Sequence, residues 1–273
     1  MSSPTPPDTL DVPEERALLV VDMKGYSKIP EAKMAPVRSD LDDILATVLT
    51  HSGLTHTRSP QSTYKDTGDG AIIVLPARHT ARLVDPLLDN LHQALKRYDR
   101  ERLASAPLIR LRASVHVGPL TADHRGDAIN EACRLVDSDA VRRAMAAAAD
   151  NGSFLAAVVS DTAFRHSVRA GRTPDLNERQ FLRTKARVDG KPDFEEVCWL
   201  FVPGLVPAMI SPYLYEQGGA PQLRPREEGA PQERAEPQAV DGHPADVRQK
   251  AKASGKARLV QVGGDYITGR ERS

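Results

Sequence analysis

The chain has 273 residues, of which 40% are hydrophobic and 27% are charged, a balance that supports one sizeable α/β domain with an extension. Its 37 Lys and Arg residues equal its 37 Asp and Glu residues, so net charge provides no general attraction to nucleic acid or anionic membranes. The N-terminus lacks a signal-peptide pattern, and no window holds the roughly 18 apolar residues of a membrane span. Cys133 and Cys198 lack metal-ligand spacing. Together these features favour a soluble cytoplasmic protein.

The first part of the chain predicts a buried strand, a helix and a hairpin. Residues 16–23 form a short apolar run rich in branched residues, which is typical of a strand buried on both faces. Residues 39–49 carry leucine, isoleucine and valine at helical spacing. Two short β-prone segments, residues 62–65 and 71–75, flank the sequence DTGDG, whose glycines and aspartates suit a tight turn.

The middle of the chain predicts two more helices with a strand between them. Asp85 and Pro86 suit the N-cap and first position of a helix that carries leucines along one face. Residues 108–117 predict a strand. The Ala-rich residues 128–149 predict a single helix that ends before Asn151.

The remaining patterned segments complete a mixed sheet with covering helices. Strands are predicted at residues 154–159, 180–188 and 197–202, and a short capped helix is predicted at residues 161–167. The sequence therefore predicts an α/β (α+β) sandwich.

The composition divides the chain into four parts. Residues 1–14 are expected to be disordered, and residues 15–205 are expected to form the domain. Residues 206–247 form a linker rich in Pro, Gly and Gln, which lacks the apolar surface needed to offset chain entropy. Residues 248–273 form a basic tail that ends in a short β-prone segment.

Polar residues that carry chemistry gather in the patterned region. Asp22 follows the first strand and Asp69 lies in the hairpin turn, and two carboxylates on neighbouring loop tips supply hard oxygen ligands for Mg²⁺ or Mn²⁺. A lone carboxylate in either place would more often be a cap or turn residue. Asn130 and Arg134 are four residues apart, which places them on one helix face.

Four sequence motifs resemble those of class III adenylyl and guanylyl cyclases. VVDMKGYS resembles their first metal motif, KDTGDG their second, LRASVHVGPL their central strand, and GDAINEACRL their catalytic helix. The motifs occur in the order of the family, over approximately residues 15–203. The resemblance implies a ferredoxin-like βαββαβ core, followed here by a disordered C-terminal tail.

The resemblance implies a role for each matching residue. It makes Asp22 and Asp69 the ligands of two Mg²⁺ or Mn²⁺ ions per site. It makes Asn130 the residue that orients the ribose and Arg134 the residue that neutralises charge on the α-phosphate. In family members that use ATP, Lys and Asp at the positions of Lys65 and Asp123 read the adenine edge, and this chain has both.

That pair also matches adenine chemically, because Lys65 donates to a ring nitrogen and Asp123 accepts from the exocyclic amine. The implied activity is conversion of ATP to 3′,5′-cyclic AMP and pyrophosphate. In the family the metal aspartates come from one subunit and the base-reading and transition-state residues from the other, so a homodimer is implied.

Several assignments stay open on the sequence alone. Lys185 and Lys191 are both candidates for the basic residue that grips the triphosphate. The Ala-rich run at residues 144–149 differs from the best-preserved family members. His116 and Trp199 are expected to belong to the core or its edge.

The C-terminal tail suggests a partner protein. Residues 260–263, VQVG, resemble the core of amyloid-type homotypic signalling motifs, so residues 259–268 are a candidate site for a partner that bears a similar motif. The simpler interpretation is an added edge strand or a frayed end.

The sequence is therefore compatible with three functions. The first is an adenylate cyclase. The second is a cyclase for GTP or a pyrimidine nucleotide, against which Lys65 and Asp123 argue. The third is a weak or inactive cyclase-like module that binds nucleotide or dimerises and signals through its C-terminal motif.

Overall fold

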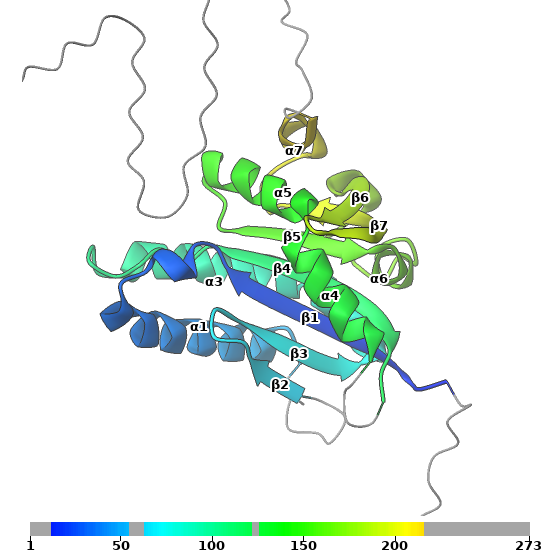
Figure 1. Ribbon diagram of the computed structural model, residues 1–273, viewed down its shortest axis with the longest axis horizontal. Helices are drawn as coiled ribbons and strands as arrows, with labels where there is room; N and C mark the ends of the chain where they lie inside the picture. Colours follow the sequence, from blue (N-terminus) through cyan, green and yellow to red (C-terminus); the bar gives the residue numbers. More distant parts are fainter. Residues whose placement is uncertain (1–11, 55–62, 122–125, 216–273) are drawn as a thin grey trace, which may run out of the picture. The chain divides into compact units, whose positions relative to one another are not determined.

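The computed structural model describes residues 12–54, 63–121 and 126–215. They contain a seven-stranded sheet in the order β2-β3-β1-β4-β5-β7-β6 (Figure 1). The strands are β1 (Glu15–Met23), β2 (Thr63–Asp66), β3 (Gly70–Pro76), β4 (Leu111–Pro119), β5 (Leu155–Ser160), β6 (Leu182–Val188) and β7 (Lys191–Phe201). The α-helices are α1 (Glu31–His51), α2 (Thr80–Val84), α3 (Leu87–Glu101), α4 (Asp127–Asp137), α5 (Asp139–Asp150), α6 (Asp161–His166) and α7 (Pro207–Tyr215).

The strand pairing confirms the predicted ferredoxin-like core. Strands β1, β2, β3 and β4 form an antiparallel sheet in the order β2-β3-β1-β4, and α1 and α3 connect them in a βαββαβ sequence. Strand β5 then adds parallel to β4, and β7 and β6 follow as antiparallel neighbours. The central strand β1 is therefore paired along its whole length with β3 on one side and β4 on the other.

The sheet is buried on both faces, which explains why β1 is a continuous apolar run. Leu19 and Val21 pack toward α1 and α3, whereas Leu18 and Val20 pack toward α4. Figure 1 shows α4 lying across the sheet near β1 and β4. The described residues form a three-layer α/β/α arrangement in which α4 and α5 cover one face of the sheet.

Two predicted helices differ in extent from the observed ones. Helix α1 begins at Glu31, eight residues before the predicted start, and accommodates Pro36 near its N-terminus. The predicted single helix at residues 128–149 is two helices that part at Ser138, whose extended backbone ends α4 and whose hydroxyl accepts a hydrogen bond from Val141 N at the start of α5. A high alanine content hid this break, because alanine favours helix throughout the segment.

The predicted cap at Asp85 is wrong, and its carboxylate has another partner. Asp85 follows α2 and its Oδ2 accepts a hydrogen bond from Asp175 N at 2.8 Å, while Pro86 occupies the N-cap position of α3. A contact between residues 90 positions apart in the chain leaves no local sequence signal. The predicted short helix is α6, and its N-cap is Ser160, whose hydroxyl accepts a hydrogen bond from Ala163 N.

The core includes the two residues assigned to it from the sequence. Trp199 stacks on Phe164 with ring centroids 3.8 Å apart and donates from Nε1 to Asp161 Oδ1, while His116 is buried in β4. Helix α7, within the segment read as linker, buries Ile210 and Leu214 in the cluster that includes α5. Among the described residues, no helix is both long enough and apolar enough to cross a membrane.

Candidate active site

Asp22 occupies the last-but-one position of β1, between two strands. Its backbone pairs with Gly70 of β3 and with Arg112 of β4. Its side chain is only 17% exposed and forms a salt bridge with Arg112, whose Nε donates to Asp22 Oδ2 at 2.9 Å and whose Nη2 contacts the same oxygen. Because both hydrogen bonds end on Oδ2, Oδ1 is the oxygen that remains for another ligand.

Asp69 lies beside Asp22 because the hairpin turn packs against the end of β1. The carbonyl of Asp69 accepts a hydrogen bond from Met23 N at 2.9 Å. Gly68 has a φ of +90° in this turn, a conformation that favours glycine, and its N–H donates to Asp66 Oδ1 at 2.6 Å. The next residue, Gly70, approaches β1 so closely that a Cβ there would lie 1.9 Å from Val21 O.

A buried arginine with two partly exposed carboxylate partners anchors β2 of this hairpin to α1. Arg38 is 9% exposed and its guanidinium lies 2.8 Å from Asp42 Oδ1 and 3.2 Å from Asp66 Oδ1. The hydroxyl of Tyr64 donates to Asp42 at 2.5 Å and accepts from Arg38 at 3.1 Å, and burial is the main cause that raises its pKa to about 12. Asp66 thus joins α1 to the turn that holds Asp69.

Asp69 is close enough to Asp22 to influence it electrostatically. Burial raises the pKa of Asp22 above its ordinary value of 3.8, Arg112 opposes this, and the negative charges of Asp69 and Asp137 raise the pKa further. A divalent cation between Asp22 and Asp69 would relieve this repulsion, and carboxylate oxygens are the ligands that Mg²⁺ prefers.

The donor set therefore fits divalent ions whose remaining ligands come from a bound triphosphate. Among the described residues no group of three or more His, Cys, Asp or Glu side chains could hold a metal ion. Mg²⁺ commonly binds through one or two carboxylates together with substrate phosphates and water, so two aspartates suffice for that mode.

Asn130 and Arg134 lie on the outward face of α4. The opposite face of the helix packs on the sheet through Ala128, Ala132, Leu135 and Val136. Asn130 is exposed, and Arg134 is half-buried with its guanidinium carbon 5.6 Å from the centre of the Phe194 ring. Within the part of the chain that the structure describes, neither Asn130 nor Arg134 forms a hydrogen bond or ion pair with the two aspartates. One protomer thus presents two separate groups of site residues.

Two lysines approach α4 from different strands. Lys65 is exposed on the edge strand β2, and Lys191 is exposed at the start of β7. Burial, the largest effect, and Asp137 raise the pKa of Cys133, whereas Lys65 and Lys191 lower it. Both positive charges therefore lie near the middle of α4. The structure therefore brings Lys65 and Lys191 to the helix that carries Asn130 and Arg134.

Lys185 has a different partner from the lysines near α4. Lys185 of β6 is engaged with Glu195, to which its Nζ is 2.5 Å distant, and Arg187 binds the same carboxylate. Asp123 lies outside the described residues, as do residues 259–268.

Sequence reasoning missed Arg112, Arg38 and Asp66 as residues that support the site. The hairpin motif KDTGDG contains Asp66, so a signal for the turn was present. Arg112 stands in the motif LRASVHVGPL, but only strand pairing reveals that it faces Asp22.

Comparisons with known proteins give structural similarity without close sequence similarity. No protein-family model matches the chain and no curated protein matches it. The catalytic core of a rhodopsin-guanylyl cyclase with converted specificity, in complex with ATPαS, is 14% identical and gives a TM-score of 0.44, over 70% of this chain and 97% of that one.

Two further solved structures are similar at the same level. A non-canonical dimeric guanylyl cyclase domain from the aquatic fungus Blastocladiella emersonii is 13% identical with a TM-score of 0.41, over 69% of this chain and 96% of that one. A bacterial light-regulated adenylyl cyclase is 15% identical with a TM-score of 0.44, over 74% of this chain and 97% of that one.

Proposed function

We propose that this chain is a nucleotide cyclase that converts ATP to 3′,5′-cyclic AMP and pyrophosphate at a site shared by two protomers. The observation that carries the proposal is that Asp69, in the turn before β3, lies beside Asp22 near the end of β1. The chain combines this pair with an outward helix face that carries Asn130 and Arg134.

The reaction is intramolecular and needs no protein nucleophile. The ribose 3′-oxygen forms a bond to the α-phosphorus, the bond from that phosphorus to the bridging oxygen breaks, and pyrophosphate leaves with the electron pair. When bound, the two divalent ions lower the pKa of the attacking hydroxyl and neutralise the triphosphate. The protein side chains position the substrate and stabilise the charge that develops on it.

Each site residue then has one task. Asp22 and Asp69 would hold the two ions through their carboxylates. Arg134 neutralises negative charge as it develops on the α-phosphate, and its contact with Phe194 limits where the guanidinium can lie. Asn130, one helical turn earlier, orients the ribose.

Adenine selection rests on Lys65 and Asp123. An ammonium that donates to a ring nitrogen and a carboxylate that accepts from the exocyclic amine match adenine, whereas guanine presents a carbonyl oxygen where adenine has the amine. The position of Lys65 near α4 agrees with this role.

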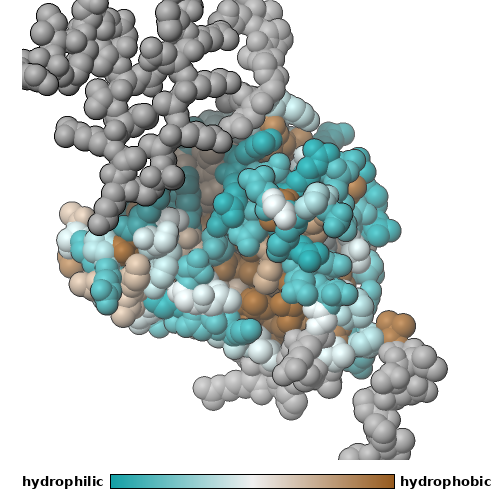
Figure 2. Space-filling model, in the orientation of Figure 1, coloured by the Kyte–Doolittle hydropathy of each residue, from teal (hydrophilic) through white to brown (hydrophobic). Residues whose placement is uncertain are grey.

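A second protomer would complete the site. The outward direction of Asn130 and Arg134 suits contact with another molecule. Figure 2 shows one apolar area near the middle of an otherwise largely hydrophilic face, over β1 and β3 next to α4. The partly buried Ile129 of α4 packs against the cluster that includes Ile72 and Val74. An isologous dimer across this face would cover that area and bring the two groups of residues together.

The test is product analysis with matched variants. Purified full chain is incubated with each of ATP, GTP, CTP and UTP plus Mn²⁺ or Mg²⁺, and products are identified by mass spectrometry. We expect cyclic AMP from the wild type, none from Asp22→Asn, and a loss of about 10²- to 10³-fold in rate from Arg134→Ala. Arg165→Ala, which removes an exposed arginine paired with Asp161 on α6, is the control and should retain activity.

Mixing two inactive variants tests the shared site. Asp22→Asn and Arg134→Ala homodimers are each defective, but a mixed dimer holds one intact site, so activity should return on mixing. Failure to regain activity, with mixed dimers demonstrated, would contradict a shared site. Cyclic GMP or a cyclic pyrimidine as the main product would overturn the adenine assignment. No cyclic product from a confirmed dimer would favour a nucleotide-binding or signalling module.

A further inference from the structure

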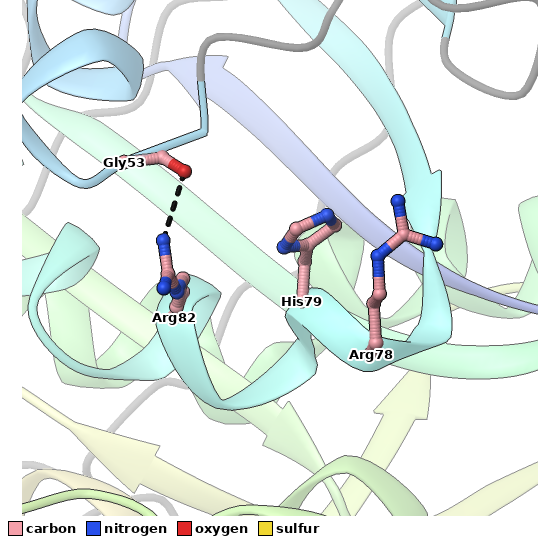
Figure 3. Close-up of a pocket in the computed structure, with 4 residues that line it drawn as sticks. All are labelled: Gly53, Arg78, His79 and Arg82. Atoms are coloured by element: carbon pink, nitrogen blue, oxygen red, sulfur yellow. Dashed lines mark hydrogen bonds between the residues drawn. The ribbon is translucent and has the colours of Figure 1, made fainter.

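A basic hollow lies at the turn between β3 and α2, at the other end of β1 from Asp22. Its lining residues are Gly53, Arg78, His79 and Arg82, and its volume is about 360 Å³ (Figure 3). In the register of the sheet Asp22 pairs with Gly70, whereas Arg16 pairs with Pro76 next to this turn. Six residues of strand separate the two ends, which is roughly 20 Å. The hollow is therefore distinct from the candidate active site.

The backbone holds Arg82 in place within this hollow. Its Nη1 donates to Gly53 O at 3.0 Å, as the dashed line in Figure 3 shows. Gly53 has a φ of +67°, and a Cβ at this position would lie 2.5 Å from the same Nη1. Glycine thus permits both the turn after α1 and the close approach of the guanidinium.

Three basic side chains gather at this hollow. Figure 3 shows Arg78, His79 and Arg82 projecting to the same side of the turn. Arg78 is exposed and has no hydrogen-bond or ion-pair partner in the part of the chain that the structure describes. No carboxylate is among the described residues that line the hollow.

The adjacent hollow has a different character. It shares Arg78 but also contains Glu14, Glu15 and Arg16, and Arg16 is neutralised by Glu14 at 2.9 Å. On the side of Arg78 that faces Arg82, by contrast, no described lining residue is negatively charged. A cation would be repelled from that side, and an apolar ligand would leave the guanidinium groups without partners.

We propose that Arg78, His79 and Arg82 form a binding site for a phosphate-type oxyanion, either inorganic phosphate or the phosphate group of a small metabolite. The guanidinium fork matches the spacing of phosphate oxygens, so each arginine donates two hydrogen bonds. His79 has a ring N–H in either neutral tautomer. The site goes beyond the proposed cyclase reaction and does not depend on it.

Calorimetric titration of the full chain with inorganic phosphate, in buffer that contains EDTA, tests this site without metal at the carboxylates. Saturable binding is expected for the wild type, and Arg78→Glu should abolish it. Arg82→Gln should weaken it at least tenfold. Among the described residues, Arg78 has no partner whose loss would disturb folding. A parallel titration uses glycerol 3-phosphate, a phosphate monoester. Tighter binding of inorganic phosphate would indicate the free ion as the ligand, and tighter binding of the monoester would indicate a metabolite.

The control is Arg97→Glu, which changes charge equally at an exposed arginine of α3 outside the hollow. It should bind phosphate like the wild type. Absence of saturable binding by the wild type at millimolar phosphate, or unchanged binding by Arg78→Glu, would overturn the proposal. So would loss of binding in Lys191→Ala alone, because the anion would then occupy the candidate active site.

Discussion

Asp22 and Arg112 face each other across β1 and β4, and the arginine holds one carboxylate oxygen of a candidate metal ligand. Arg112 is the main influence that lowers the pKa of Asp22, against burial and the charges of Asp69 and Asp137. The pair thus opposes protonation of a largely buried carboxylate while leaving its second oxygen for a cation.

Arg112→Gln should shift the titration of Asp22 to higher pH. The remaining influences all raise the pKa, so the carboxylate gains its proton earlier as the pH falls, and divalent-ion binding is lost at a higher pH than in the wild type. Carboxyl-carbon NMR of Asp22 and Mn²⁺ titration at several pH values measure both effects. Arg97→Gln, on an exposed arginine of α3, is the control, and a shift toward lower pH in Arg112→Gln would contradict this account.

Gly70→Ala should disrupt the pairing that brings the two aspartates together. The added Cβ would lie 1.9 Å from Val21 O, a backbone atom that moves only if β3 separates from β1. The expected loss of unfolding free energy is at or above the upper end of the about 1–3 kcal/mol typical of overpacking. Gly152→Ala, at a positive φ with open space around it, should cost about 1 kcal/mol. Urea denaturation compares the two, and equal losses would argue against the close approach at Gly70.

Much of the fold follows from local pattern. The apolar run of β1, the turn chemistry of DTGDG and the leucine spacing of α3 each determine an element through nearby residues, and these predictions are confirmed. The order of those elements then restricts the sheet to few topologies.

The parts that escaped prediction depend on distant partners. Asp85 has the composition of a cap, but a backbone N–H 90 residues away binds its carboxylate. Arg112 is an ordinary strand residue until β4 lies beside β1. Lys185 and Lys191 are equivalent by spacing, and only the β6–β7 pairing sends one to Glu195 and the other toward Cys133.

His116 should make the fold less stable as the pH falls below its ordinary pKa of 6.5. Burial lowers the pKa of His116 in the folded protein, with Glu131 opposing, so below pH 6.5 the unfolded chain binds a proton that the folded chain does not. Stability is therefore present above pH 6.5 and declines as the pH falls toward the folded-state pKa. His116→Gln should show a shallower decline in urea denaturation across this window. Burial lowers the pKa of His92 as well, so some dependence should remain. Identical pH dependence in variant and wild type would refute the assignment.

The two cysteines should react with alkylating reagents at different rates. Burial raises the pKa of Cys198 to about 12 and the residue is inaccessible, whereas Cys133 is half-buried on α4 with a pKa raised by burial. Because the thiolate is the reactive form, native protein near neutral pH should be modified slowly at Cys133 and at Cys198 only after unfolding. Iodoacetamide labelling followed by peptide mass spectrometry measures both rates. Cys133→Ser serves as the control, and modification of Cys198 at the rate of Cys133 would contradict the buried position.

Lys191 rather than Lys185 should bind the triphosphate. Lys185 is held by Glu195, which also binds Arg187, so its charge is already compensated. Lys191 has no ion-pair partner among the described residues and its charge reaches Cys133, beside Arg134. Lys191→Ala should therefore raise the KM for ATP by about tenfold or more, the effect of losing one charged hydrogen bond, whereas Lys185→Ala should change it little. Steady-state kinetics with saturating Mn²⁺ measure both variants. If neither variant turns over, binding of a non-hydrolysable ATP analogue gives the same comparison. A larger effect in Lys185→Ala would mean that substrate binding rearranges the β6–β7 hairpin and breaks the bond to Glu195.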